Sequence, residues 1–465
     1  MIGYLVLLIS LIAIWRITLR YNGGDYLKPS SIIVFLQIFS VIFAIVGLSS
    51  WNSKGNDISI LTYFIVVVSS ILAVSGCFFA DKYRFKAINS SKFRKRISAR
   101  LTEKENIAAY RYTIGIGYYF ILLFVEIVLM YLYYHFLCIT FGTTNIAKLV
   151  YFGHEYYFWP SLVKNAGAQT IARYCFKLVK CISYAFIFTL SYNIAVKGKG
   201  KIRLIPPIIL FILGWLLDGS RHNAMLTLIA IILLSYVISK KVKPNGNRAV
   251  KKSKKRRRVI LIVFASIAVI YFFISFANLW AGHNANPLAY GSFTFGCSIP
   301  TMNEALEIRQ GFDSLRAFGS TTFRGIYKLL RSMNLITGYN ETTKGWIIFS
   351  DASGTTYASN TFSAAYNLYF DFGFIGMMFF SFLEGLFYEK IYLIAKKARK
   401  NEILPMIIFA FFLPSLFNWF RTEDLISSNL IEISTYFMIP LTVIIIKTFF
   451  KRVKNLEKME DNNDT

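Results

Sequence analysis

The apolar residues of this chain fall into long runs that are separated by short polar segments. A run of about 18 to 25 apolar residues is long enough to cross a hydrocarbon layer roughly 30 Å thick as a helix. Such a helix also satisfies its own backbone hydrogen bonds, which lipid cannot do. The pattern predicts an all-α polytopic membrane protein with about eleven transmembrane helices, at approximately 2–19, 31–50, 58–80, 113–137, 174–196, 204–218, 223–239, 259–280, 372–394, 403–420 and 430–448.

These runs divide the chain into four parts. Residues 1–280 hold eight predicted helices with short loops, and residues 372–450 hold the last three. Residues 281–371 form the one long polar segment, and residues 451–465 form a basic tail. Long loops usually carry a function or are disordered. This one is rich in aromatic residues and glycine, so we expect an ordered outer loop.

Lysine and arginine predict the orientation of the chain. The segments 81–111 and 240–258 and the tail after residue 447 are strongly basic, and all fall on one side if the helices alternate. The positive-inside rule makes that side the cytoplasm. We therefore expect an outer N-terminus, a cytoplasmic C-terminus and a location in a cytoplasmic membrane. The net charge of +28 lies mainly in these loops, so it predicts no nucleic-acid partner.

A helical pattern of basic residues stands out in the long outer loop. Arg324, Lys328 and Arg331 follow an i, i+4, i+7 spacing, which covers an arc of about 60° on a helix. We expect an amphipathic helix near 320–336 that lies on the membrane surface. Its basic face suits either lipid headgroups or the diphosphate of a lipid-linked substrate, which arginine binds in a bidentate manner.

A second candidate site is the turn before the seventh predicted helix. Arg221 lies there beside Gly219 and Ser220, at the outer edge where the positive-inside trend disfavours a cation. The amides that open the following helix also favour an anion. The alternative is an ion pair between Arg221 and Asp218 within a tight turn. His222 is either a base or an interfacial residue.

Two further candidates lie near the ends of outer segments. Asp371 opens the ninth predicted helix, where an acid suits the helix dipole with or without a catalytic role. Arg421, with Glu423 and Asp424, lies in the last outer turn, which could equally be a solvated loop.

Several kinds of chemistry lack their sequence signals. The histidines and the five cysteines show no metal-ligand spacing, so we expect no metal, no cofactor and no disulfide. There is no P-loop motif, and energy must come from an activated substrate or an ion gradient.

Two stretches, together with the predicted topology, resemble the O-antigen polymerase (Wzy) family of oligosaccharide repeat-unit polymerases. One is Leu217–Asn223, with its glycine-serine-arginine turn. The other runs from Asn360 to Tyr366 and then from Tyr369 to Gly376, with an aromatic-acid-aromatic-glycine entry to a helix. The likeness covers most of the chain as topology but only about thirty residues as motif.

The resemblance implies a metal-independent, membrane-embedded glycosyltransferase of the C type. Its substrates would be oligosaccharide units on undecaprenyl diphosphate, joined into O-antigen or a related surface polysaccharide of lipopolysaccharide or exopolysaccharide type. The family's glycine-serine-arginine position corresponds to Arg221, and loop arginines correspond less closely to Arg324 and Arg331. The base is left open among His222, Asp371 and Glu423.

The resemblance also implies partners, namely membrane lipid, a chain-length regulator and other polysaccharide-assembly proteins. The O-antigen ligases are a related alternative. A flippase for lipid-linked sugars is an alternative of another class, although it favours two repeated halves and short loops. A scaffold for a synthesis complex is a third.

Overall fold

The computed structural model describes most of the predicted spans. The described residues are 1–51, 57–88, 110–155, 160–196, 202–239, 287–308, 318–336, 347–350, 354, 356–397 and 403–454. Within these ranges, seven helices have the length and composition to cross a membrane, and three apolar helices are shorter. The prediction of an all-α polytopic membrane protein is confirmed. The predicted span 259–280 and the basic segment 240–258 lie outside the described residues, so the number eleven stays a prediction.

The chain forms two compact units. Unit 1 comprises Met1–Thr102, Asn284–Ile394 and Ser415–Thr435. Unit 2 comprises Glu103–His283, Ala395–Pro414 and Tyr436–Thr465. Each unit therefore combines stretches that are distant along the chain, and the predicted division into spans, loop and tail stays a prediction.

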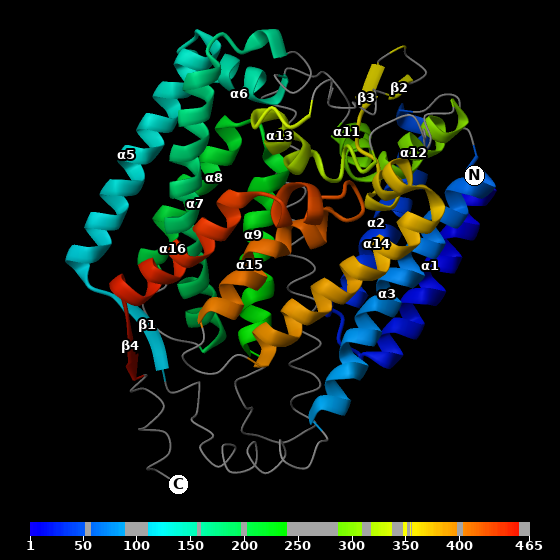
Figure 1. The fold of residues 1–465 in the computed structure, drawn as a ribbon, viewed down its shortest axis with the longest axis horizontal. Helices are drawn as coiled ribbons and strands as arrows, with labels where there is room; N and C mark the ends of the chain where they lie inside the picture. Colours follow the sequence, from blue (N-terminus) through cyan, green and yellow to red (C-terminus); the bar gives the residue numbers. More distant parts are fainter. Residues whose placement is uncertain are drawn as a thin grey trace. The chain divides into compact units, whose positions relative to one another are not determined.

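Unit 1 combines long membrane helices with the short elements of the outer loop (Figure 1). Its elements are α1 (Ile2–Tyr21), α2 (Pro29–Trp51), α3 (Ile60–Ile88), α11 (Pro287–Gly296), α12 (Ser298–Glu307), α13 (Arg324–Ser332), β2 (Ile347–Ser350), β3 (Thr356–Ser359) and α14 (Ala364–Lys397). A π-helical segment, Leu425–Leu430, also belongs to it. β2 and β3 pair as an antiparallel hairpin. The described part of the segment 281–371, which was predicted as an outer loop, is thus folded.

Helix α14 begins at Ala364, eight residues before the predicted start at 372. Its first turns carry Asn367 and Asp371, and both side chains are buried against protein. A search for apolar runs misses this segment because it contains polar residues. These residues are buried nevertheless, since neighbouring groups satisfy their hydrogen bonds. Gly373 interrupts the helix at a kink, where its φ is 69°. A residue with a Cβ would rarely adopt this backbone conformation.

Polar contacts join the helices of unit 1 at one end. The Gly3 amide donates to Asp57 Oδ1 at 2.9 Å, which ties the start of α1 to the α2–α3 connection. Asn303 of α12 accepts hydrogen bonds from the Ser59 amide (2.7 Å) and from Thr62 Oγ1 (2.9 Å). The beginning of the chain, the α2–α3 connection and the outer loop therefore share one end of unit 1.

A buried ion cluster joins the opposite end. Lys28, in the α1–α2 turn, forms an ion pair with Asp81 of α3 and another with Glu389 of α14, the second at 3.2 Å. Tyr392 donates to Asp25 at 3.2 Å. The two acids keep Lys28 protonated: burial lowers its pKa, but Glu389 and Asp81 raise it further, and the net direction is upward.

Unit 2 is a helical bundle around α7. Its elements are β1 (Tyr110–Ile114), α5 (Ile116–Phe141), α6 (Ile146–Glu155), α7 (Ala166–Ala195), α8 (Ile205–Leu217), α9 (Arg221–Ser239) and β4 (Phe450–Lys454); α15 (Ile403–Asn418) and α16 (Ile433–Phe449) contribute to both units. Helix α7 packs against α5, α8 and α9 (Figure 1). Its second half is almost wholly buried. It is therefore the central helix of this unit.

A two-stranded antiparallel sheet closes one end of unit 2. β1 pairs with β4 over five residues, with Tyr112 opposite Arg452. The Asn193 side chain, near the end of α7, accepts from the Tyr112 amide (3.0 Å) and donates to the Tyr112 carbonyl (2.8 Å). The segment that precedes α5 and the segment that follows α16 therefore lie together.

Candidate functional site

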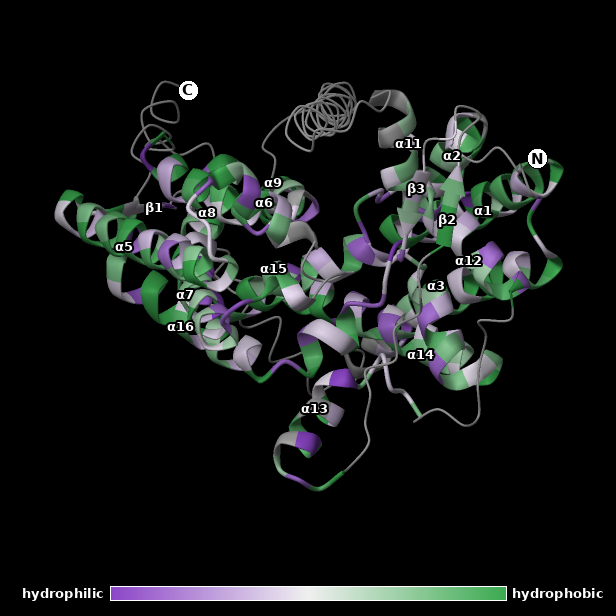
Figure 2. Ribbon diagram, turned by 90° about the horizontal axis from the view of Figure 1, so that it is seen from above, coloured by the Kyte–Doolittle hydropathy of each residue, from purple (hydrophilic) through white to green (hydrophobic). Residues whose placement is uncertain are grey.

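The basic helix predicted in the outer loop corresponds to α13. Arg324 and Arg331 are both exposed, and the Lys328 side chain lies outside the described part. Ile326, at 43% exposed, and Met333, at 58%, are also open. Figure 2 shows hydrophilic residues along this helix. A helix that exposes both arginine and large apolar side chains is suited to a membrane surface.

Helix α13 is held against the π-helical segment. Arg324 donates to Ser428 Oγ at 3.2 Å. The Gly325 backbone also lies close to the Ile431 side chain, because a Cβ on Gly325 would come within 2.6 Å of Ile431 Cγ2. Glycine at this position therefore allows α13 to pack beside the chain that follows α15.

Asp371 anchors the turn that leads into α13. Its carboxylate accepts from the amides of Thr321 (3.2 Å) and Thr322 (2.5 Å) and from both threonine hydroxyls (2.5 Å each). We call these three residues the threonine cradle. Three of these donors reach Oδ2 and one reaches Oδ1, and together they tie Asp371 to the turn, so the cradle positions the start of α13. A catalytic role for Asp371 stays a prediction.

The last outer turn, predicted from Arg421, Glu423 and Asp424, is built into unit 1. Asn367 of α14 donates to Thr422 Oγ1 at 3.1 Å. Glu423 accepts from the amides of Ile426 (2.6 Å) and Ser427 (3.0 Å), which open the π-helical segment. Burial raises the pKa of Glu423, against the lowering effect of these amides. The turn is therefore packed and hydrogen-bonded rather than a solvated loop.

The glycine-serine-arginine turn lies in unit 2. Gly219 has a φ of 68°, and its amide donates to the Leu216 carbonyl at 3.0 Å, which ends α8. Helix α9 begins at Arg221, and Asn223 donates to Ser220 Oγ at 2.7 Å. The N-terminal turn of a helix generally favours an anion. His222 is half-buried, and the Arg221 side chain lies outside the described part.

Asp218, for which the sequence analysis considered an ion pair with Arg221, has two partners on other helices. It interacts electrostatically with Arg173 of α7 and by a hydrogen bond with Tyr133 of α5. Desolvation by the surrounding protein raises the pKa of Asp218 to about 7, although Arg173 and Tyr133 both lower it. Helix α6 also packs on this turn, since a Cβ on Gly153 would come within 3.0 Å of the Leu217 carbonyl oxygen.

The candidate residues thus fall into two groups. Arg324, Arg331, Asp371 and Arg421 belong to unit 1, whereas Arg221 and His222 belong to unit 2. The sequence analysis did not identify Arg173, Tyr133, Thr321, Thr322 or Trp419. None of these stands in a recognisable motif, because each acquires its role from a neighbour that is distant along the chain.

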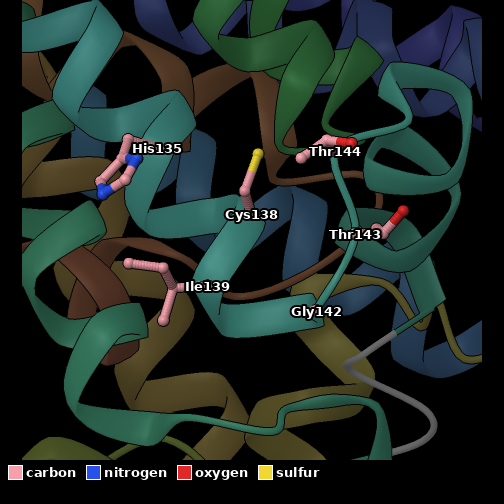
Figure 3. A pocket seen from close by; sticks show the side chains of 6 residues that line it. All are labelled: His135, Cys138, Ile139, Gly142, Thr143 and Thr144. Atoms are coloured by element: carbon pink, nitrogen blue, oxygen red, sulfur yellow. The ribbon is translucent and has the colours of Figure 1, made fainter.

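A small depression lies at the end of α5 in unit 2 (Figure 3). His135, Cys138 and Ile139 of α5 line it together with Gly142, Thr143 and Thr144. All of these come from one short stretch of chain, so the depression follows from the end of a single helix. It brings none of the candidate residues together.

Among the described residues, no group of three or more histidine, cysteine, aspartate or glutamate side chains could hold a metal ion. The chain matches no protein-family model, no curated protein and no solved structure in the comparisons. The case for a function therefore depends on the sequence motifs and on the geometry of the two units.

Proposed function

We propose that this protein is a membrane glycosyltransferase that polymerises undecaprenyl-diphosphate-linked oligosaccharide units into a surface polysaccharide. The observation that carries the proposal is the exposed basic helix α13, anchored by the threonine cradle and by Ser428 beside a packed outer turn. Such a helix offers guanidinium groups at a membrane surface, where a lipid diphosphate would be presented.

Contacts within each unit support the proposed topology. In unit 2, β1 begins at the end of the basic segment 81–111 and pairs with β4 of the C-terminal tail. Alternating spans require these two basic segments to lie on the same side of the membrane. In unit 1, Lys28 contacts Asp81 and Glu389, which the same alternation assigns to the cytoplasmic side. We therefore propose a bacterial cytoplasmic membrane, with the outer loop and the N-terminus facing out.

The chemistry needs two kinds of group. A lipid diphosphate leaves readily if its developing charge is stabilised, at roughly 3 to 4 kcal/mol for each well-placed donor. Within unit 2 the candidate for that stabilisation is Arg221, and within unit 1 the candidates are the arginines of α13. The acceptor hydroxyl needs a base, for which His222 and Glu423 are the better candidates, since the Asp371 carboxylate already accepts four hydrogen bonds.

Deletion of the gene tests the reaction. A polymerase mutant accumulates lipid carriers with a single unit and caps its surface lipid with one unit. Loss of all capping would indicate a ligase instead. Reconstitution with purified lipid-linked units separates the enzyme from a flippase, because only the enzyme lengthens the chain. A chain-length regulator would alter the product lengths without being needed for lengthening.

Substitution of Arg221 by lysine tests the site. Lysine keeps the charge but lacks the planar fork, so Arg221→Lys should lower the polymerisation rate at least about tenfold. Arg203→Lys is the matched control, because Arg203 lies in the short helix at the other end of α8. Full activity of Arg221→Lys would remove this arginine from the phosphate role.

A further inference from the structure

Two buried carboxyl groups meet in unit 1. Glu384 lies within the long apolar helix α14, and Glu423 lies in the turn after α15. Glu384 is 1% exposed and Glu423 is 3% exposed. Trp419, itself 1% exposed, donates its indole Nε1–H to Glu384 Oε2 at 2.6 Å. The two glutamate side chains lie close enough for one to donate a proton to the other. We call Glu384 and Glu423 the acid pair.

A hydrogen bond within the acid pair requires a proton. Ionised carboxylates only accept hydrogen bonds, so two of them cannot bond to each other. Among the described residues, no donor reaches Glu384 Oε1. A proton held between the two groups supplies that missing donor. It also avoids two adjacent negative charges in a buried site, which like-charge repulsion strongly disfavours.

Three other titratable groups lie near the pair, in space or along the chain. Asp424 follows Glu423 in the turn, and its charge opposes ionisation of Glu423. Tyr388, one turn further along α14, faces both glutamates and forms a hydrogen bond with Ser415. Arg421 is the nearest cation along the chain, two residues before Glu423.

The acid pair connects to the basic helix through the π-helical segment. Glu423 accepts from the amides of Ile426 and Ser427, and the Ser427 hydroxyl donates back to the Glu423 carbonyl at 2.5 Å. The next residue, Ser428, accepts from Arg324 of α13. A π-helical turn is often found at functional sites. A displacement of Glu423 would therefore be transmitted to the partner of Arg324.

We propose that Glu384 and Glu423 form a proton-binding site that holds the π-helical segment in place while one proton is shared, and releases it when the proton leaves. The sign follows from charge. With one proton the pair carries a single negative charge, which the two amides stabilise. Without it, two buried carboxylates repel each other, and Glu423 separates from α14 together with the segment that it caps. The proposal does not depend on the proposed function, since its measurements need no substrate.

Hydrogen exchange of the purified full-length protein in detergent tests the coupling. The amides of Leu425–Leu430 should be protected at neutral pH. As the pH rises, and after correction for intrinsic exchange, their protection should fall by roughly tenfold per pH unit once the shared proton dissociates. Glu384→Gln provides a permanent donor, so this variant should keep its protection. Equal pH responses of the wild type and Glu384→Gln would overturn the proposal.

Infrared spectroscopy tests the proton itself. The wild type should show a protonated carboxyl band at neutral pH that Glu384→Gln lacks. Glu126→Gln is the matched control, because Glu126 is a fully buried acid of α5 that bonds to Ser183 in unit 2. This control should keep the pH response of Leu425–Leu430. Failure of Glu384→Gln to remove a carboxyl band would refute the shared proton.

A second variant serves if Glu384→Gln does not fold. Glu423→Gln donates to Glu384 from the other side, while its side-chain oxygen still accepts from the π-helical amides. It should likewise abolish the alkaline loss of protection. If it shows the pH response of the wild type, the acid pair is not the proton site.

Discussion

The threonine cradle and the acid pair make opposite uses of a buried acid within one unit. Asp371 and Glu423 both lie near the end of an outer segment, and both were candidates for a base. Asp371 accepts from four donors of Thr321 and Thr322. Glu423 accepts from two amides and faces a second acid, Glu384. The supply of donors, rather than position along the chain, decides whether an acid anchors a turn or holds a proton.

The difference has a physical basis. The Asp371 carboxylate accepts from four donors, which tie it to the turn before α13. A carboxyl that meets another carboxyl is stable only when one of them is neutral. The cradle should therefore respond mainly to loss of its acceptor, and the acid pair mainly to pH and to isosteric replacement.

The largest expected effect is loss of the cradle's acceptor. Asp371→Ala leaves two buried amides and two hydroxyls without a partner and should cost about 3 kcal/mol or more in the free energy of unfolding. Asp371→Asn keeps one oxygen and should cost less. Thermal unfolding in detergent measures both. A change below about 1 kcal/mol in the alanine variant would show that the cradle is not an anchor.

The next effect separates a carboxyl acceptor from a hydroxyl acceptor. Trp419→Phe removes the donor to Glu384 and should cost about 2 kcal/mol, since hydrogen bonds to charged groups are worth about 1.5 to 3 kcal/mol. Trp51→Phe is the matched control: Trp51 is equally buried but donates to Ser292 Oγ, at 3.1 Å. It should lose only about 1 kcal/mol of hydrogen bonding. Equal losses would mean that the carboxyl gives no extra stability.

A third acid extends the comparison to unit 2. Desolvation raises the folded-state pKa of Asp218 from 3.8 to about 7. The protonated Asp218 side chain therefore contributes fully to the stability of the fold below about pH 4, and this contribution is lost as the pH rises through about 7. The side chain introduced by Asp218→Asn stays neutral, so the Tm of this variant should rise relative to that of the wild type as the pH increases over this range. Asp57→Asn should show the opposite sign, and only below about pH 4. Burial raises the pKa of Asp57, but the amides of Gly3 and Ile58 outweigh it, so the net shift is downward and the wild type loses stability relative to the variant as the pH falls. A parallel pH dependence of the wild type and Asp218→Asn would contradict this prediction.

The smallest effect concerns the link to α13. Ser428→Ala removes the exposed hydrogen bond from Arg324 and should change the free energy of unfolding by no more than about 0.5 kcal/mol. If the π-helical segment positions Arg324 for a substrate, the same variant should still lower the polymerisation rate. A rate equal to that of the wild type would separate the segment from the reaction.

The sequence by itself determined the class of this protein. Runs such as Ile116–Phe141 exclude most other folds, since only a helix satisfies its backbone across lipid. The i, i+4, i+7 spacing of Arg324, Lys328 and Arg331 likewise marks a helix wherever it lies, because the period depends only on local geometry.

Only the tertiary structure decided the partners of the acids. Asp218 interacts with Arg173 and Tyr133, which are both distant from it along the chain. Glu384 and Glu423 are 39 positions apart, and Asp371 lies about 50 positions from its threonines. No local pattern specifies such pairs. The environment of a buried charge is set by whichever distant segments the packing of the helices brings against it.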